Sequence, residues 1–112
     1  MARTPRNYSS DVQLSTTATD VISTVPLSTS VIVRKLSFYN SGSSTREVTV
    51  FLLPSSGTAG TSTTLVVKSI PSGKTWNVTE VQGEILEEGM RVQASQDAGS
   101  DINANCSGAD IT

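Results

Sequence analysis

Apolar and polar residues alternate along much of this chain, and a period of two predicts β-strands rather than helices. The strongest run covers residues 31–39, and the next covers residues 46–53. One face of the first run contains Ile32, Arg34, Leu36 and Phe38. The other face contains Val31, Val33 and Tyr39. Further alternating runs cover residues 65–70, 75–79, 90–95 and 102–106. The pattern predicts about seven or eight short strands.

Turn-forming segments separate these runs. Residues 40–44 are Asn-Ser-Gly-Ser-Ser, so we predict a hairpin over residues 31–53. Pro71–Lys74 predicts a tight turn, and Gly108 with the preceding Ser107 is expected to break the last strand. Residues 80–88 are the one stretch in which we expect a helical turn. Turn signals at about every eight to twelve residues are typical of a sandwich of antiparallel sheets.

We therefore predict an all-β protein, a single-domain antiparallel β-sandwich or jelly roll with a short extended N-terminal arm. The arm is expected over residues 1–11, where Pro5 discourages a strand, and the sandwich over residues 12–112. The expected core consists of Ile32, Leu36, Phe38, Val48, Val50, Leu52, Leu65, Val67, Trp76, Val78, Leu86, Val92 and Ile102.

The composition agrees with strands and turns. Serine and threonine make up about three residues in ten, whereas hydrophobic residues make up 36% and charged residues 16% of the 112 residues. The net charge is −2, so we expect no nucleic-acid or anionic-membrane partner. No apolar run is long enough to span a bilayer, and no secretory h-region is present. We expect synthesis in the cytosol.

Two features suggest contacts with a partner. Arg3 and Arg6 make the first ten residues basic, which is typical either of a solvated terminus or of an arm that reaches a neighbouring subunit. The strands over 31–39 and 46–53 are apolar on both faces, more than one small core can cover. We infer that a second face packs against a subunit or partner, and that it contains Val31, Val33, Tyr39 and Phe51.

The chain offers little catalytic or metal-binding chemistry. It has no histidine, and its single cysteine, Cys106, alternates with apolar residues as a small buried side chain would. Gly73-Lys74-Thr75 resembles the end of a phosphate-binding loop, but Lys68 stands where that motif needs a glycine. Asp97 and Asp101 are expected in a polar turn rather than in a calcium site. Glu87 and Glu88 are adjacent, so in an extended chain they would point to opposite sides and make a poor catalytic pair. We predict no catalytic residue, no metal and no cofactor.

Five segments between Ser30 and Thr112 resemble small structural proteins of tailed-bacteriophage virions, of the jelly-roll head decoration (cement) type. The segments are Leu36 to Ser41, with its strand ending in Asn-Ser; Glu47 to Pro54, with Val-x-Val-x-Leu-x-Pro; Ile70 to Lys74; Leu86 to Val92; and Ser107 to Ile111. Those proteins often have Asp after the glycine of the fourth segment, where this chain has Met90.

The resemblance implies a capsid decoration protein on the virion surface, bound to the major capsid protein as a dimer or trimer. In that reading, Arg3 and Arg6 dock on an acidic capsid surface. The alternative is a tail, neck or fibre module that binds a host-surface glycan, for which Trp76, Tyr39 and Asp97 are the candidate residues. A third interpretation is a cell-wall hydrolase, but the chain has no histidine and no suitable pair of carboxylates for that reaction.

Overall fold

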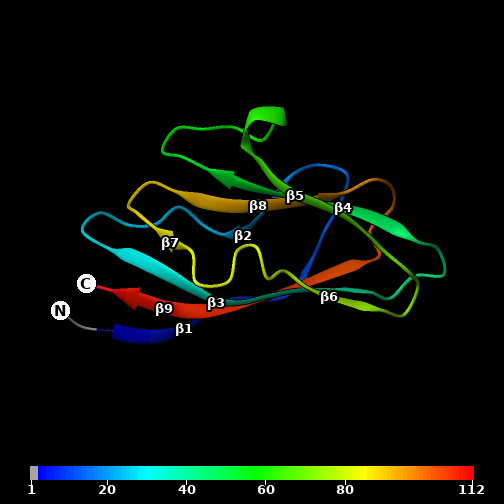
Figure 1. Cartoon of the computed structure of the whole chain (residues 1–112), viewed down its shortest axis with the longest axis horizontal. Helices are drawn as coiled ribbons and strands as arrows, with labels where there is room; N and C mark the ends of the chain where they lie inside the picture. The colour runs from blue at the N-terminus through cyan, green and yellow to red at the C-terminus, as the bar shows by residue number, and fades with distance from the viewer. Residues whose placement is uncertain (1–2) are drawn as a thin grey trace.

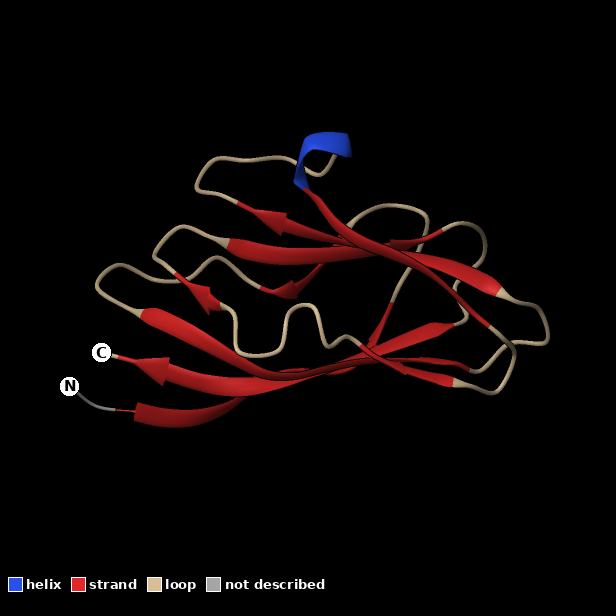
Figure 2. Cartoon of the chain, in the orientation of Figure 1, coloured by secondary structure: helices blue, strands red, loops and turns tan. Residues whose placement is uncertain are grey.

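A computed structural model of the protein describes residues 3–112, with every side chain in that range except those of residues 9–11. Two antiparallel sheets pack face to face (Figure 1), and strands and loops make up nearly all of the described chain (Figure 2). Sheet A, the lower sheet in Figure 1, has the strand order β1-β9-β3-β6, with β7 beside β3. Its strands are β1 (Arg3–Gln13), β9 (Ile102–Ile111), β3 (Ser30–Asn40), β6 (Thr75–Asn77) and β7 (Ile85–Leu86).

Sheet B, the upper sheet, has the strand order β2-β8-β4-β5. Its strands are β2 (Thr19–Ile22), β8 (Arg91–Gln96), β4 (Arg46–Leu53) and β5 (Thr64–Ile70), and the 3-10 helix η1 (Thr61–Thr63) precedes β5. The pairs β1·β9, β2·β8, β3·β6 and β4·β5 are nested in the sequence. Nested antiparallel pairs distributed over two sheets form a jelly roll, so the predicted all-β sandwich is confirmed. No helix in residues 3–112 is long and apolar enough to cross a membrane.

Most of the predicted core lies between the sheets. The buried members are Leu36, Phe38, Val48, Val50, Trp76, Val78, Leu86, Val92 and Ile102. Ile32, Leu52 and Leu65 are only half-buried, and Val67 is exposed. The exceptions on β5 have a common cause, because this strand forms one edge of sheet B and has a neighbour on one side alone.

The predicted hairpin over residues 31–53 is wrong, because β3 belongs to sheet A and β4 to sheet B. The connection passes from one sheet to the other, and the buried side chain of Asn40 holds it. The Asn40 amide nitrogen donates to the carbonyl oxygens of Ser44 (2.8 Å) and Ile70 (2.9 Å), while its oxygen accepts from the Gly42 N–H (2.9 Å). A polar glycine-containing turn alone does not distinguish a hairpin from such a crossing.

The start of the chain also differs from the expectation that Pro5 discourages a strand. Residues 3–13 form β1, which pairs with β9, and Pro5 lies opposite Ala109. Proline is tolerated there because β1 is an edge strand, where a residue without an N–H need not break a hydrogen-bond ladder. Residues 1–2 of the expected arm lie outside the described residues.

Two further local expectations are corrected. β9 continues through Ser107 and Gly108 to Ile111, because strands β1 and β3 pair with it on both sides. Residues 80–88 contain turns and the two-residue strand β7, with no helix. In both cases, hydrogen bonds from distant segments decide the local conformation.

Candidate functional site

A β-bulge in β3 changes which residues of this strand point into the core. Val33 lies opposite Gly108 of β9 and Lys35 lies opposite Ser107, so Arg34 is the additional residue. The inward side chains are therefore those of Val31 and Val33 before the bulge, and of Leu36 and Phe38 after it. The exposed fractions of Val31 and Val33 are 2% and 0%. This corrects the placement of these two valines on a partner-facing surface, because the chain's own core covers them.

The other four predicted contact residues are distributed over separate surfaces. Tyr39 is 44% exposed on the outer face of sheet A, whereas Phe51 is half-buried in sheet B. Arg3 lies opposite Ile111 of β9 and Arg6 lies opposite Gly108. Because side chains alternate along a strand, this odd separation places the two arginines on opposite faces of β1. The structure does not bring the predicted set together.

The outer face of sheet A instead brings together a set of amide and hydroxyl side chains. The strand register forms three rows across the sheet: Gln13, Asn103, Tyr39 and Thr75; then Asn105, Ser37 and Asn77; then Asn7, Ser107 and Lys35. We call this surface the amide face, because five of these ten side chains are Asn or Gln. Nearly all of them are exposed or half-exposed.

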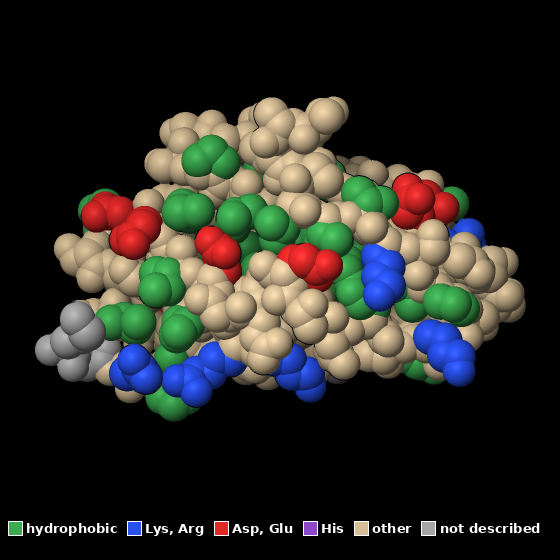
Figure 3. Space-filling view, viewed as in Figure 1, with side chains coloured by type: hydrophobic (Ala, Val, Ile, Leu, Met, Phe, Trp, Pro, Cys, Tyr) green, Lys and Arg blue, Asp and Glu red, His purple; other side chains and the backbone are tan. Residues whose placement is uncertain are grey.

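Among the side chains that the structure describes, the three rows of the amide face contain no carboxylate. Asp110 of β9 has its side chain on the inner side of the sheet, where it lines a cavity with Tyr8 and Val31. Arg34 and Lys35, which project at the β3 bulge, are exposed. Figure 3 shows Lys and Arg side chains along the lower margin of the molecule, where sheet A lies, and Asp and Glu side chains higher up. Arg34 and Lys35 thus add positive charge to the outer side of sheet A, in a chain whose net charge is −2.

Two irregularities in strand pairing shape this face. A register shift between β1 and β9 falls between Asn7 and Ser9, and the β3 bulge falls at Arg34, so Ser107 is flanked on both sides. A hollow of about 550 Å³ lies here, lined by Pro5, Arg6, Asn7, Arg34, Lys35, Asn105, Ser107 and Gly108. A Cβ at Gly108 would collide with the Ile32 carbonyl oxygen, so β9 needs glycine there. Bulges often re-aim side chains at functional surfaces.

The chemistry of the amide face favours binding over catalysis. Each Asn or Gln side chain both donates and accepts hydrogen bonds, and Arg34 and Lys35 add charged donors. The rows contain no histidine or cysteine. A polar or acidic surface could therefore form many hydrogen bonds with this face.

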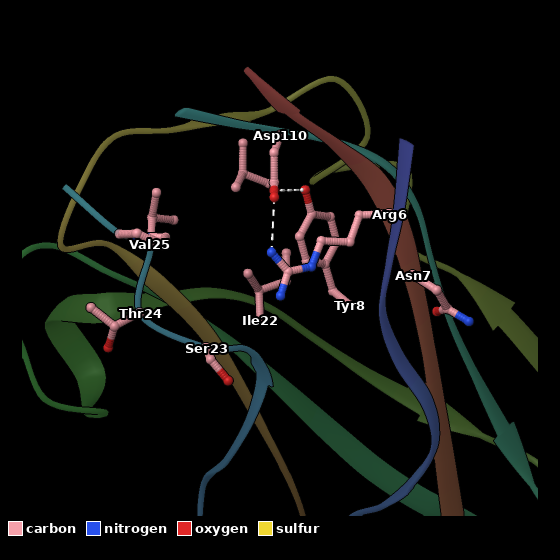
Figure 4. A pocket seen from close by; sticks show the side chains of 10 residues that line it. Arg6, Asn7, Tyr8, Ile22, Ser23, Thr24, Val25 and Asp110 are labelled. Carbon is pink, nitrogen blue, oxygen red and sulfur yellow. Dashed lines mark hydrogen bonds and ion pairs between the residues drawn. The ribbon is translucent and has the colours of Figure 1, made fainter. Parts of the chain in front are cut away.

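The inner side of β1 carries a separate charged cluster (Figure 4). Arg6 Nη1 lies 2.8 Å from Asp110 Oδ2, and the Tyr8 hydroxyl donates to Asp110 Oδ1 at 2.6 Å. Burial raises the pKa of the Asp110 carboxyl, but hydrogen bonds from Tyr8 and Arg6 outweigh it and hold that pKa below its usual value. Burial and the bond to Asp110 raise the pKa of Tyr8 far above its ordinary value. The cluster borders a cavity of about 110 Å³ that is also lined by Ile22 and Val25.

Other polar residues singled out in the sequence have partners within the chain. Asp97 Oδ1 accepts from the Glu47 N–H (3.1 Å), and Asp101 Oδ2 accepts from Arg46 Nε (2.9 Å). Gly73 and Lys74 form a turn that leads into strand β6 rather than a helix. Within residues 3–112, the side chains of His, Cys, Asp and Glu do not gather into a group of three that could hold a metal.

Cys106 is buried, as predicted, and burial raises its pKa to about 12. The residues expected for glycan binding are separated: Trp76 is buried with its ring centroid 5.7 Å from that of Phe38, and Asp97 lies in the turn after β8. Tyr39 alone of these three lies on the amide face.

Sequence reasoning missed the asparagines of β9. Asn is depleted in strands, so Asn103 and Asn105 at alternating positions of one strand were a usable signal. Their neighbours Asn7 and Asn77 come from strands far away in the sequence, and only the register brings them alongside.

No protein-family model matches the chain, and no curated protein matches it. Among solved structures, the fold is similar to that of a chain in "Crystal structure of infectious bursal disease virus VP2 subviral particle", with a TM-score of 0.41 and 12% sequence identity. The match covers 97% of the present chain, which spans about a third (32%) of that protein's length. The function proposed below therefore rests on the chain's own residues.

Proposed function

We propose that this chain is a virion structural protein, a capsid decoration (cement) protein that binds the outer shell through its amide face. The observation that carries the proposal is that face itself: a broad sheet surface whose described side chains include no carboxylate, with Tyr39 exposed and Arg34 at its margin. Tyrosine and arginine are enriched at protein interfaces and acidic residues are depleted there. Asparagine and serine supply adaptable hydrogen bonds, as they do in antibody binding sites.

The fold and the sequence support this proposal by analogy. Jelly rolls recur in viral capsid and lectin domains, although a fold does not by itself determine function. The five segments that resemble tailed-phage decoration proteins include Ser107 to Ile111, which contains the glycine that lets β9 pass between β1 and β3. Strand β9 therefore contains both one of the resembling segments and residues of the amide face.

The proposed mechanism is the addition of interface area between neighbouring major capsid subunits. Arg34 and Lys35, with Arg3 on the same side of β1, would meet acidic groups of the shell, while the amides hydrogen-bond around Tyr39. Contacts that bridge two subunits would oppose their separation under the pressure of packaged DNA. The protein would act without a cofactor and without catalysis, as a dimer or trimer on the capsid surface.

A pelleting assay tests this function. The purified protein would be mixed with expanded shells that lack it, and the bound copies would be counted after sedimentation. We expect saturable binding in a fixed ratio to the major capsid protein, and a raised melting temperature of the shell. Wild-type protein that stays in the supernatant would refute the decoration role.

Two double variants test the face. Arg34→Glu with Lys35→Glu should abolish shell binding, because it replaces two exposed positive charges at this face by carboxylates. Lys68→Glu with Lys74→Glu makes the same charge change on β5 and the β5–β6 turn, and should leave binding unchanged. If both variants bind like wild type, the amide face is not the docking surface.

The second candidate function is glycan binding by a tail, neck or fibre module. It is favoured by Tyr39, whose exposed ring lies between Asn103 and Thr75 on a face of five amides. Sugar hydroxyls can hydrogen-bond to amides while the sugar ring stacks on an aromatic side chain. Binding to a glycan array that is lost in Tyr39→Ala, without binding to shells, would favour this function over decoration.

A further inference from the structure

The two sheets of the sandwich have four edges, and three of them are protected against pairing with another strand. On β1, protection comes from Pro5 and the register shift after Asn7, and β2 has only four residues, with an irregular register. β6 and β7 are short, and the connection between them bonds to β3: Gly83 N–H donates to the Val33 carbonyl oxygen (2.7 Å) and Val33 N–H to that of Glu84 (2.9 Å). Short strands, proline and bulges are common ways of protecting an edge.

The fourth edge, β5, is less protected, because a single bulge at Leu65 is its one irregularity and residues 66–70 pair with β4 in continuous register. It has seven residues, Thr-Leu-Val-Val-Lys-Ser-Ile, with one charge and no proline. β5 pairs with β4, and in the described part of the chain no strand lies on its other side. Val67 is 47% exposed, and Leu65 and Val66 are half-buried. Figure 3 shows hydrophobic side chains gathered across the upper middle of the molecule, where β5 runs in Figure 1.

We propose that β5 pairs antiparallel with β5 of a second copy of this chain, across a two-fold axis. An open edge offers alternating N–H and C=O groups, and an extended strand is the partner that satisfies them. A two-fold contact uses the same surface on both copies and is closed, so it ends at a dimer. The contact joins the two B sheets into one continuous sheet.

The sequence of β5 supports this pairing and its register. When the pair is centred on Val67, the two Val67 side chains form an apolar cross-strand pair. Lys68, the single charge of the strand, then lies opposite Val66 of the second copy and not opposite its own counterpart. Like charges directly opposite each other would destabilise the pair, and this register avoids them.

The proposal is compatible with shell docking and independent of it. β5 belongs to sheet B, whereas the amide face is the outer face of sheet A. A two-fold axis perpendicular to sheet B places both amide faces on the same side of the dimer. The inference specifies the dimer within the proposed function, but its test needs only the purified chain, so the two can fail separately.

Sedimentation equilibrium over a range of concentrations is the test. Wild-type protein should reach twice the chain mass of 11.7 kDa. Val67→Lys should weaken dimerisation at least tenfold, because two lysines would then face each other across the axis. Thr49→Lys is the matched control: Thr49 lies opposite Val67 on β4, so this variant adds the same charge one strand away from the edge. It should dimerise like wild type.

Hydrogen exchange gives a second readout. The amides of β5 should exchange more slowly in the wild-type dimer than in folded Val67→Lys, whose fold is checked by circular dichroism. A wild-type protein that stays monomeric at its highest soluble concentration would overturn the proposal. So would an undiminished dimer in Val67→Lys, equal loss of the dimer in Thr49→Lys, unprotected β5 amides, or assembly beyond a dimer.

Discussion

The two ends of the sandwich are held together by different chemistry. At the end with the turns after β3 and β8, two buried amide side chains, Asn40 and Gln96, hydrogen-bond to backbone groups. At the other end, where β1 meets the end of β9, the charged cluster of Arg6, Tyr8 and Asp110 lies beside a small cavity. The turn end also has one ion pair, Arg46 with Asp101, which is partly exposed.

The difference separates large, neutral contributions to stability from small, titratable ones. A buried amide that is removed leaves backbone groups without partners, and each such group costs about 1–3 kcal/mol. An ion pair near the surface contributes about 0–1 kcal/mol because water screens it. We therefore expect the turn end to dominate the free energy of unfolding, and the β1 end to make it depend on pH.

The largest effect is expected for Asn40→Ala. This variant leaves the carbonyl oxygens of Ser44 and Ile70 and the N–H of Gly42 without their partner, so it should lower the free energy of unfolding by about 3 kcal/mol. Urea denaturation measures the change. Asn105→Ala, on the exposed amide face, is the control and should change stability by less than about 0.5 kcal/mol. Equal losses in the two variants would contradict the comparison.

A smaller effect is expected for Tyr8→Phe. The change removes the hydroxyl that donates to Asp110 at 2.6 Å but keeps the ring, so the loss should be about 1 kcal/mol. Tyr39→Phe removes the same group from an exposed tyrosine and should cost close to nothing. Thermal unfolding of both variants beside wild type gives the answer, and a loss as large as that of Asn40→Ala would place the main anchor at the β1 end.

The smallest effect is a dependence on pH. The pKa of Asp110 is lower in the folded chain than in the unfolded chain, so its contribution is complete above the unfolded value, about 3.9. It is lost as the pH falls through the folded value. Asp110→Asn should therefore flatten this part of the acid limb of the stability profile, as measured by urea denaturation from pH 6 down to about pH 2.

The alkaline side gives an internal check. Tyr8 has a raised pKa in the folded chain, so its contribution to the free energy of unfolding should be present below the unfolded value of about 10 and fall above it.

The acid side also has an outcome that would contradict the prediction. If the charged cluster makes no contribution to stability, the stability profile of Asp110→Asn will have an acid limb as steep as that of wild type.

Much of the fold could be predicted from local patterns. Period-two alternation placed β3, β4, β5 and β8 within a few residues of their bounds, because a half-buried strand must alternate wherever it lies. The candidate site could not be predicted in the same way. The inference about Val31 and Val33 failed because one additional residue, Arg34, exchanges the two faces of β3.

The sequence by itself determined that the chain is all-β, that β3, β4, β5 and β8 are strands, and that it offers little chemistry for catalysis. Those properties depend on residue type and short-range spacing. The tertiary structure alone decided that β3 and β4 lie in different sheets, that residues 3–13 are a strand, and that amides from three strands, β1, β6 and β9, share one face. The reason is that register is set between partners such as β1 and β9, which lie at opposite ends of the chain.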